Sequence, residues 1–314
     1  MDSKRKMFVL IMAAAVCTGL FLFYALPSVW EYALPRRMTK VLAIILVGTA
    51  IGYSSMIFQT ITNNRILTPG ILGLDSLYVL LQTAVIYFFG AAQLAELGKN
   101  ANFLMSTGLM VCFSFALFAL MFRRGGRHIF LLLLVGVVFG TLFRSLSSFM
   151  QMLIDPNEFQ VVQNKMFASF NNVNTDILLL ASAVIIAVLA YAWRFRRIFD
   201  VLSLGRDHAV NLGIDYDRTV KKMLIIVAVL VSVSTALVGP ITFLGLLAVN
   251  VAREFFKTYK HSVLIPGAVL FSIIALVGGQ FIVEKVFGLT ATLVVIIDFI
   301  GGIYFIYLLL KERK

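Results

Sequence analysis

The stretch from Met223 to Ala252, MLIIVAVLVSVSTALVGPITFLGLLAVNVA, runs for 30 residues without a charged side chain and is interrupted once, at Gly239-Pro240. A helix crosses the roughly 30 Å hydrocarbon core of a bilayer with about 20 apolar residues, so this stretch is too long for one ordinary span. Because a Gly-Pro pair interrupts a helix, we expect two short helices that fold back on each other inside a membrane.

The remainder of the chain continues this pattern. It has 314 residues, of which 61% are hydrophobic and only 13% charged, whereas soluble domains are typically about 45–50% apolar and about 25% charged. Further apolar runs cover 7–26, 41–61, 71–90, 103–122, 129–150, 177–193, 262–283 and 286–310. With the interrupted stretch counted twice, the sequence predicts an all-α polytopic membrane protein with ten transmembrane helices, forming a single domain over residues 1–314.

The distribution of basic residues indicates how the chain is oriented. An even number of spans places both termini on one side, and cytoplasmic loops are enriched in Lys and Arg. A cytoplasmic N-terminus puts twenty basic residues on the cytoplasmic side and six outside, with Arg144 inside a span. We therefore expect a cytoplasmic-membrane protein with both termini in the cytoplasm. Topology then explains most of the net charge of +12, and no nucleic-acid partner is needed.

Motifs of membrane enzymes are absent from the sequence. It contains no G-x-x-x-x-G-K-[ST] loop for a nucleotide phosphate, no H-E-x-x-H and no G-x-S-x-G. Its three histidines, His128, His208 and His261, lie in separate loops without a second ligand at helical spacing. We expect no covalent chemistry, no metal site and no cofactor held by this chain.

Polar and small residues recur at helical spacing in two spans, where polar side chains tend to face the protein interior or a water-filled path. The first stripe is Gly48, Gly52, Ser55, Gln59 and Thr62, and the second is Gly136, Gly140, Arg144, Ser147, Ser148 and Gln151. Tight helix packing is the expected role of the glycines. Arg144 lines a translocation pathway, forms a buried ion pair with Asp298 or Asp75, or does both. The candidate pathway residues are Gln59, Arg144, Ser147, Ser148, Gln151 and Asp298.

Two loops stand out. The long cytoplasmic loop 194–222 carries two Leu-Gly steps, Leu204-Gly205 and Leu212-Gly213. Since glycine can end one helix and turn the chain into the next, the loop predicts two short helices across the bilayer plane that could dock a cytosolic partner. A solvated basic loop is the alternative.

The extracytoplasmic loop 151–176 spaces Phe159, Val162, Met166 and Phe170 for a short amphipathic helix against the membrane. It is either a plain connector or a plug over the pathway.

The segment 202–213, LSLGRDHAVNLG, resembles the coupling helices of the FecCD-type permeases, the transmembrane subunits of bacterial ABC importers for iron siderophores, haem and cobalamin. Other matching motifs are Leu34-Pro35-Arg36, Pro69-Gly70-Ile71-Leu72-Gly73 and Gly239-Pro240-Ile241. Residues 62–78 are similar to the branch that imports ferric catecholate or mixed-type siderophores such as anguibactin or petrobactin.

The sequence departs from the family pattern at several positions. Val249-Asn250 stands where the family has Pro-His, Arg65 replaces the proline of N-P, Gln280 an aspartate, and Glu284 an arginine. These changes indicate a divergent branch.

The resemblance implies four partners: a cytosolic ATPase dimer that binds ATP-Mg, a second permease that is typically a paralogue, an extracytoplasmic siderophore-binding protein, and the ferric siderophore. It implies ATPase coupling through Leu204, Gly205, Arg206, Asp207, Ala209, Leu212 and Gly213, and binding-protein docking through Arg36 and Arg37. Arg144 would attract an anionic ferric siderophore. An ion-coupled secondary transporter of a small anionic solute is the competing interpretation, and a stoichiometric ATPase partner would exclude it.

Overall fold

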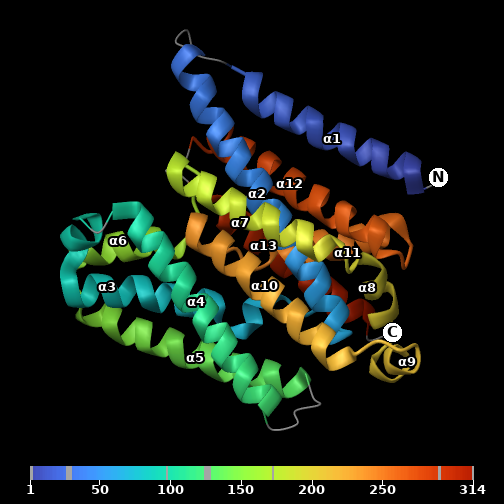
Figure 1. Cartoon of the computed structure of the whole chain (residues 1–314). Coiled ribbons are helices and arrows are strands. Elements are labelled where there is room, and N and C mark those ends of the chain that lie inside the picture. Colours follow the sequence, from blue (N-terminus) through green and yellow to red (C-terminus); the bar gives the residue numbers. More distant parts are fainter. Residues whose placement is uncertain are drawn as a thin grey trace.

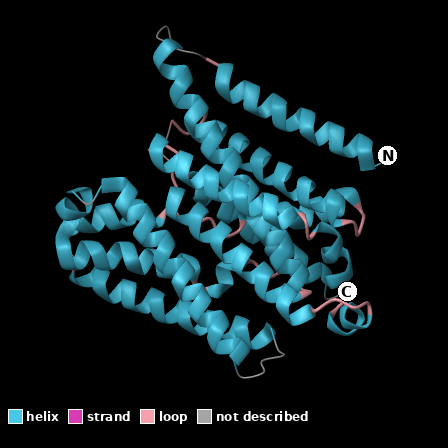
Figure 2. Cartoon of the chain, viewed as in Figure 1, coloured by secondary structure: helices cyan, strands magenta, loops and turns pink. Residues whose placement is uncertain are grey.

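The computed structural model describes residues 3–25, 30–96, 98–123, 129–171, 173–288 and 291–312. All regular structure within these ranges is helical (Figure 2). The helices, with the short 3-10 helix η1, are α1 (Ser3–Phe23), α2 (Trp30–Thr62), η1 (Pro69–Leu72), α3 (Leu74–Glu96), α4 (Gly98–Arg123), α5 (Ile129–Leu153), α6 (Pro156–Met166), α7 (Thr175–Trp193), α8 (Arg196–Leu202), α9 (Arg206–Asn211), α10 (Tyr216–Val238), α11 (Leu244–Phe256), α12 (His261–Lys285) and α13 (Leu293–Glu312).

Eight helices of the described chain are long and apolar enough to cross a membrane: α1, α2, α3, α4, α5, α7, α10 and α12. A shorter apolar stretch, Leu293–Leu308 in α13, coincides with the expected last span. Together with the short helix α11, these elements correspond to the ten predicted helices. The all-α polytopic fold expected from the sequence is therefore confirmed.

The interruption at Gly239-Pro240 differs from the prediction in one respect. The helix before it, α10, is 23 residues long rather than short, and only α11, with 13 residues, is truncated. Instead of folding back on α10, α11 packs mainly against α12, α2 and α13. The expectation of two short helices packed on each other was wrong, because α11 packs on the next helix, α12, and on α2 instead.

Small residues allow the central helices to approach closely. α2 packs against α12 along a seam that includes Gly48 and Gly52. A Cβ added at Gly52 would lie 2.8 Å from Ser272 Oγ and 3.0 Å from the Ala268 carbonyl oxygen, so a larger side chain would separate the two helices. Gly245 of α11 approaches Ser55 of α2 even more closely. The packing role expected for the stripe glycines is confirmed in α2.

Close approach at small residues also explains the Pro69–Gly73 motif. Gly73 ends η1 in the left-handed conformation (φ +80°), and a Cβ there would lie 3.0 Å from the Cα of Gly140 in α5. Gly136, one turn earlier, lies against Leu72. Gly136 and Gly140 of α5 therefore allow η1 to pack directly against the backbone of α5.

The loop 151–176 contains the predicted amphipathic helix as α6. Asp155 caps its first turn by accepting a hydrogen bond from the Asn157 amide at 2.9 Å. Its apolar face packs on the end of α3, where Val162 and Ile86 are fully buried, so this face contacts protein rather than the membrane. Farther along, the Ser169 amide donates to the Val238 carbonyl at 2.8 Å, which attaches the loop to the end of α10.

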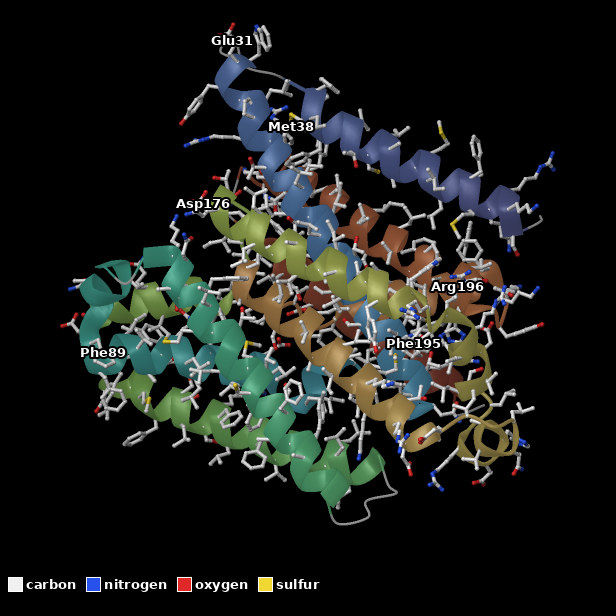
Figure 3. All side chains as sticks on the ribbon, viewed as in Figure 1. Glu31, Met38, Phe89, Asp176, Phe195 and Arg196 are labelled. Atoms are coloured by element: carbon white, nitrogen blue, oxygen red, sulfur yellow. The ribbon has the colours of Figure 1, made fainter. Side chains whose placement is uncertain are left out.

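The helices run between two ends of the molecule (Figure 1). Both chain ends lie near the end that carries α8 and α9, and α6 lies at the other. Figure 3 agrees, with Glu31 and Phe89 toward one end and Phe195 and Arg196 toward the other. The predicted coupling loop and the two chain ends therefore share one end of the molecule.

Candidate functional site

The loop 194–222 folds as predicted, with the two short helices α8 and α9. Gly205, at φ +94°, precedes α9, and Gly213, at φ +82°, follows it. These left-handed conformations favour glycine, which explains both Leu-Gly steps. Open space surrounds both Cβ positions, so backbone conformation rather than packing within this chain requires the glycines.

Three apolar side chains on α9 and its flanks project away from the protein. Leu204, Val210 and Leu212 are 56%, 48% and 63% exposed, and we call them the coupling patch. They belong to the segment between the long apolar helices α7 and α10, and exposed apolar clusters of this kind mark protein contacts. Sequence analysis missed Val210, although its spacing from Leu212 and Leu204 in a surface loop could have revealed it.

The other predicted coupling residues divide between the surface and the interior. Ala209 is fully buried within this chain, because α9 turns this side chain toward its own core. Asp207 is exposed. Arg206 lies 3.4 Å from Asp217 and over the ring of Tyr216, which fixes its position beside the coupling patch.

At the opposite end, Arg36 and Arg37 have different environments. The guanidinium of Arg37 donates to the carbonyls of Leu22, Tyr24 and Ala25 at 2.8–3.2 Å. It therefore satisfies carbonyls that the end of α1 leaves unpaired and ties α1 to α2. Arg36 is exposed and lies over the ring of Tyr32, 4.6 Å from its centroid. Arg36 is available for a partner, whereas Arg37 is engaged in the fold.

The structure explains one pair of departures from the family pattern. Glu284, at a position where the family has arginine, forms a salt bridge of 2.7 Å with Lys40 of α2. Gln280, where the family has aspartate, donates to the same carboxylate at 2.9 Å. The Lys40–Glu284 pair therefore joins α12 to α2.

The polar residues of α5 do not all face the same environment. Ser147 is buried and bonds to Thr83 of α3 at 2.9 Å, and Gln151 donates to both hydroxyls. These residues join α5 to α3. Arg144 and Ser148 instead face outward and are exposed.

Asp298 is not the partner of Arg144. Within the described residues Arg144 forms no salt bridge, and the Asp298 carboxylate accepts the Phe243 amide at 3.4 Å, at the start of α11. Asp75 accepts a hydrogen bond from Thr235 at 3.1 Å. The expected ion pair between Arg144 and either acid is absent from the described chain. Each carboxylate instead accepts a hydrogen bond close to the break between α10 and α11.

Gln59 lies in the interior of this chain, with 1% of its surface exposed. It borders a cavity of about 600 Å³ at the end of α2, together with residues of α11 and α12. The first polar stripe is thus directed at α11 and α12 and is separate from the exposed face of α5.

Comparison with known proteins relates this architecture to a family. The model of the FecCD transport family matches residues 7–311, almost the whole chain. The chain belongs to this family. It is 68% identical over 314 residues to the petrobactin import system permease protein YclO of Bacillus subtilis, covering 100% of this chain and 99% of that protein.

A petrobactin import system permease protein of Bacillus anthracis, FatC, is 34% identical over 278 residues, which are 88% of this chain and 78% of that protein. Among solved structures, an inward-facing metal-chelate type ABC transporter matches with a TM-score of 0.85 and 20% identity, covering 99% of this chain and all of that one. This likeness confirms the fold. As a FecCD member with eight long apolar helices, the chain is a transport subunit of the membrane.

Proposed function

We propose that the chain is the permease subunit of an ABC importer that carries a ferric siderophore across the bacterial cytoplasmic membrane, with ferric petrobactin as the first cargo to test. The observation that carries the proposal is the 68% identity to a petrobactin import permease over the full length. The exposed coupling patch supports the proposal. A permease without a nucleotide-binding loop needs a surface that binds a separate ATPase subunit and transmits its conformational change.

The ATPase dimer, which would hold ATP-Mg, then docks on Leu204, Val210 and Leu212, with Arg206 and Asp207 as polar contacts. This end of the molecule is cytoplasmic, in agreement with the positive-inside rule, and both termini lie on the same side. A second permease and an extracytoplasmic binding protein complete the importer.

A complementation experiment tests this function. A strain that lacks the chain is given the tagged gene, and uptake of radioactive iron as ferric petrobactin is measured, followed by mild-detergent purification and mass spectrometry. We expect restored uptake and co-purification of an ATPase and a second permease. Uptake without an ATPase would instead favour an ion-coupled secondary transporter of a small anionic solute.

Arg36 is the candidate contact for the binding protein. Charge reversal, Arg36→Glu, is expected to slow association of the binding protein about tenfold at low salt, because exposed charges steer encounter more than they set affinity. The difference should shrink as salt is raised. Surface plasmon resonance on the reconstituted permease measures this rate.

Arg37→Gln is the matched comparison for Arg36. Since Arg37 caps α1, its replacement should lower the melting temperature and leave the salt dependence of association unchanged. Equal association rates for Arg36→Glu and the wild type would remove Arg36 from the docking surface.

Arg144 and Ser148 are the remaining pathway candidates on α5. Because Arg144 is exposed and forms no ion pair in the described chain, Arg144→Met should leave the fold intact. It should reduce uptake of an anionic ferric siderophore about tenfold, since a cation in a low-dielectric path attracts an anion more strongly than in water. Uptake by proteoliposomes measures the effect, and a rate equal to wild type would exclude the pathway role.

A further inference from the structure

The cavity beside Gln59 opens near the end of the molecule that carries α8 and α9. Its volume of about 600 Å³ falls in the range of small-molecule sites. It is lined by the end of α2 and the turn after it, the end of α11, the start of α12, and Ser203 between α8 and α9. Ser203 directly precedes Leu204 of the coupling patch, so the cavity adjoins the coupling segment.

Two side chains in the cavity wall, Gln59 and Arg253, have buried polar atoms without hydrogen-bond partners in the described chain. Gln59 is 1% exposed, and neither its amide nitrogen nor its amide oxygen has a partner within the described chain. The Nε of Arg253 is also buried without a partner, and Arg253 Nη2 reaches only the Met56 sulfur, at 3.7 Å. Buried polar atoms are nearly always hydrogen-bonded. A ligand with acceptor oxygens would satisfy these donors.

The cavity has an excess of positive charge. Arg65, Arg253 and Lys257 line it, against the single carboxylate of Glu254, which accepts a hydrogen bond from Tyr304 at 3.5 Å. The guanidinium groups of Arg65 and Arg253 share the wall of this cavity, and like charges repel each other. An anion between them would remove this repulsion.

His261 does not contribute a free donor. Its ring nitrogens bond to Asp200 at 2.8 Å and to Thr60 at 2.8 Å, so this side chain is fixed in the wall.

The backbone that carries Arg65 is held in place. The Asn250 side chain of α11 donates to the Arg65 carbonyl at 3.0 Å, and the Asn64 side chain accepts the Ile66 amide at 2.9 Å. Arg65 and Asn250 both stand where the family pattern has other residues, proline and histidine, and they contact each other here. The two departures together place an arginine beside Arg253.

We propose that this cavity binds a small oxyanion, a carboxylate or phosphate compound, between Arg65 and Arg253, with the Gln59 amide as a further donor. The site is distinct from the exposed face of α5 and from the coupling patch. Only the assignment of this site to the cytoplasmic side depends on the proposed function. All residues of the site come from this chain, so anion binding does not require the other subunits of an importer.

Binding to the purified full-length chain tests the proposal without any transport step. Citrate and inorganic phosphate are titrated separately by isothermal calorimetry in detergent, at constant ionic strength set with chloride. We expect saturable binding of at least one of them. The anion with the lower Kd identifies the preferred class of ligand, carboxylate or phosphate. Arg65→Met and Arg253→Met should each raise the Kd at least tenfold, because each removes a charge-assisted contact.

Arg218→Met is the matched control, since its side chain is 83% exposed and lies outside the cavity. Its Kd should equal that of the wild type. If Arg253→Met fails to fold, Arg65→Met alone tests the proposal. The side chain of Arg65 is exposed, and the hydrogen bond from Asn250 is to its backbone carbonyl, so this substitution should not disturb the fold.

Two results would overturn the proposal. They are no saturable binding of either anion, and Kd values for Arg65→Met and Arg253→Met that equal the wild-type value. Failure of the uptake experiment would not affect this test, so the two conclusions can be separated.

Discussion

Replacement of Leu204 and Leu212 by aspartate is expected to abolish co-purification of the ATPase and to reduce iron uptake by about 100-fold or more. Each leucine is more than half exposed in this chain, and burying one leucine at an interface contributes roughly 1.5–3 kcal/mol. Loss of both contacts, with two charges placed in an apolar contact, exceeds the ~2.7 kcal/mol that corresponds to 100-fold. Mild-detergent purification followed by quantitative mass spectrometry measures the ATPase-to-permease ratio.

Val286→Asp is the matched control for this double variant. Val286 is 70% exposed and follows α12 at the end of the molecule away from α9, so the same kind of substitution is made outside the coupling patch. Its ATPase ratio should equal that of the wild type. A normal ratio in the double variant would show that the patch faces solvent or another partner.

Gly239→Val is expected to lower the free energy of unfolding by about 2–5 kcal/mol. Gly239 has φ +105°, a conformation that costs a residue with a Cβ roughly 1–2 kcal/mol. The added Cβ would also lie 2.9 Å from the Cα of Ala168, and overpacking against backbone costs a further ~1–3 kcal/mol. Thermal unfolding of the purified chain, followed by circular dichroism, measures the loss.

Gly278→Val provides the comparison for Gly239→Val. Gly278 lies in α12, and open space surrounds its Cβ position. This variant should therefore keep a melting temperature close to that of the wild type. If Gly239→Val is equally stable, then the contact between the outer loop and the α10–α11 break contributes little to the fold.

Local patterns were enough to predict much of the fold. Charge-free runs of about 20 residues located the spans, because the bilayer imposes that length. The Leu-Gly steps located α8 and α9, because positive φ at Gly205 and Gly213 restricts the residue type. The family resemblance, which rested on short motifs in the correct order, is confirmed by the match over residues 7–311.

The sequence could not predict which contacts form between residues distant in sequence. Helical spacing placed Arg144 on a polar stripe, but it could not determine which side of α5 faces α3. The position of Arg37 next to Arg36 suggested a shared role, whereas the turn of α2 directs Arg37 to the end of α1. Ala209 is buried because of tertiary packing around α9, and spacing within a six-residue helix does not define that side.

The short helix α11 also constrains how the protein is made. With 13 residues it is about 20 Å long, less than the hydrocarbon thickness, and it packs chiefly on α12. A nascent chain that ends after Phe256 lacks this support. We therefore expect α11 to reach its final position only after α12 has been synthesised.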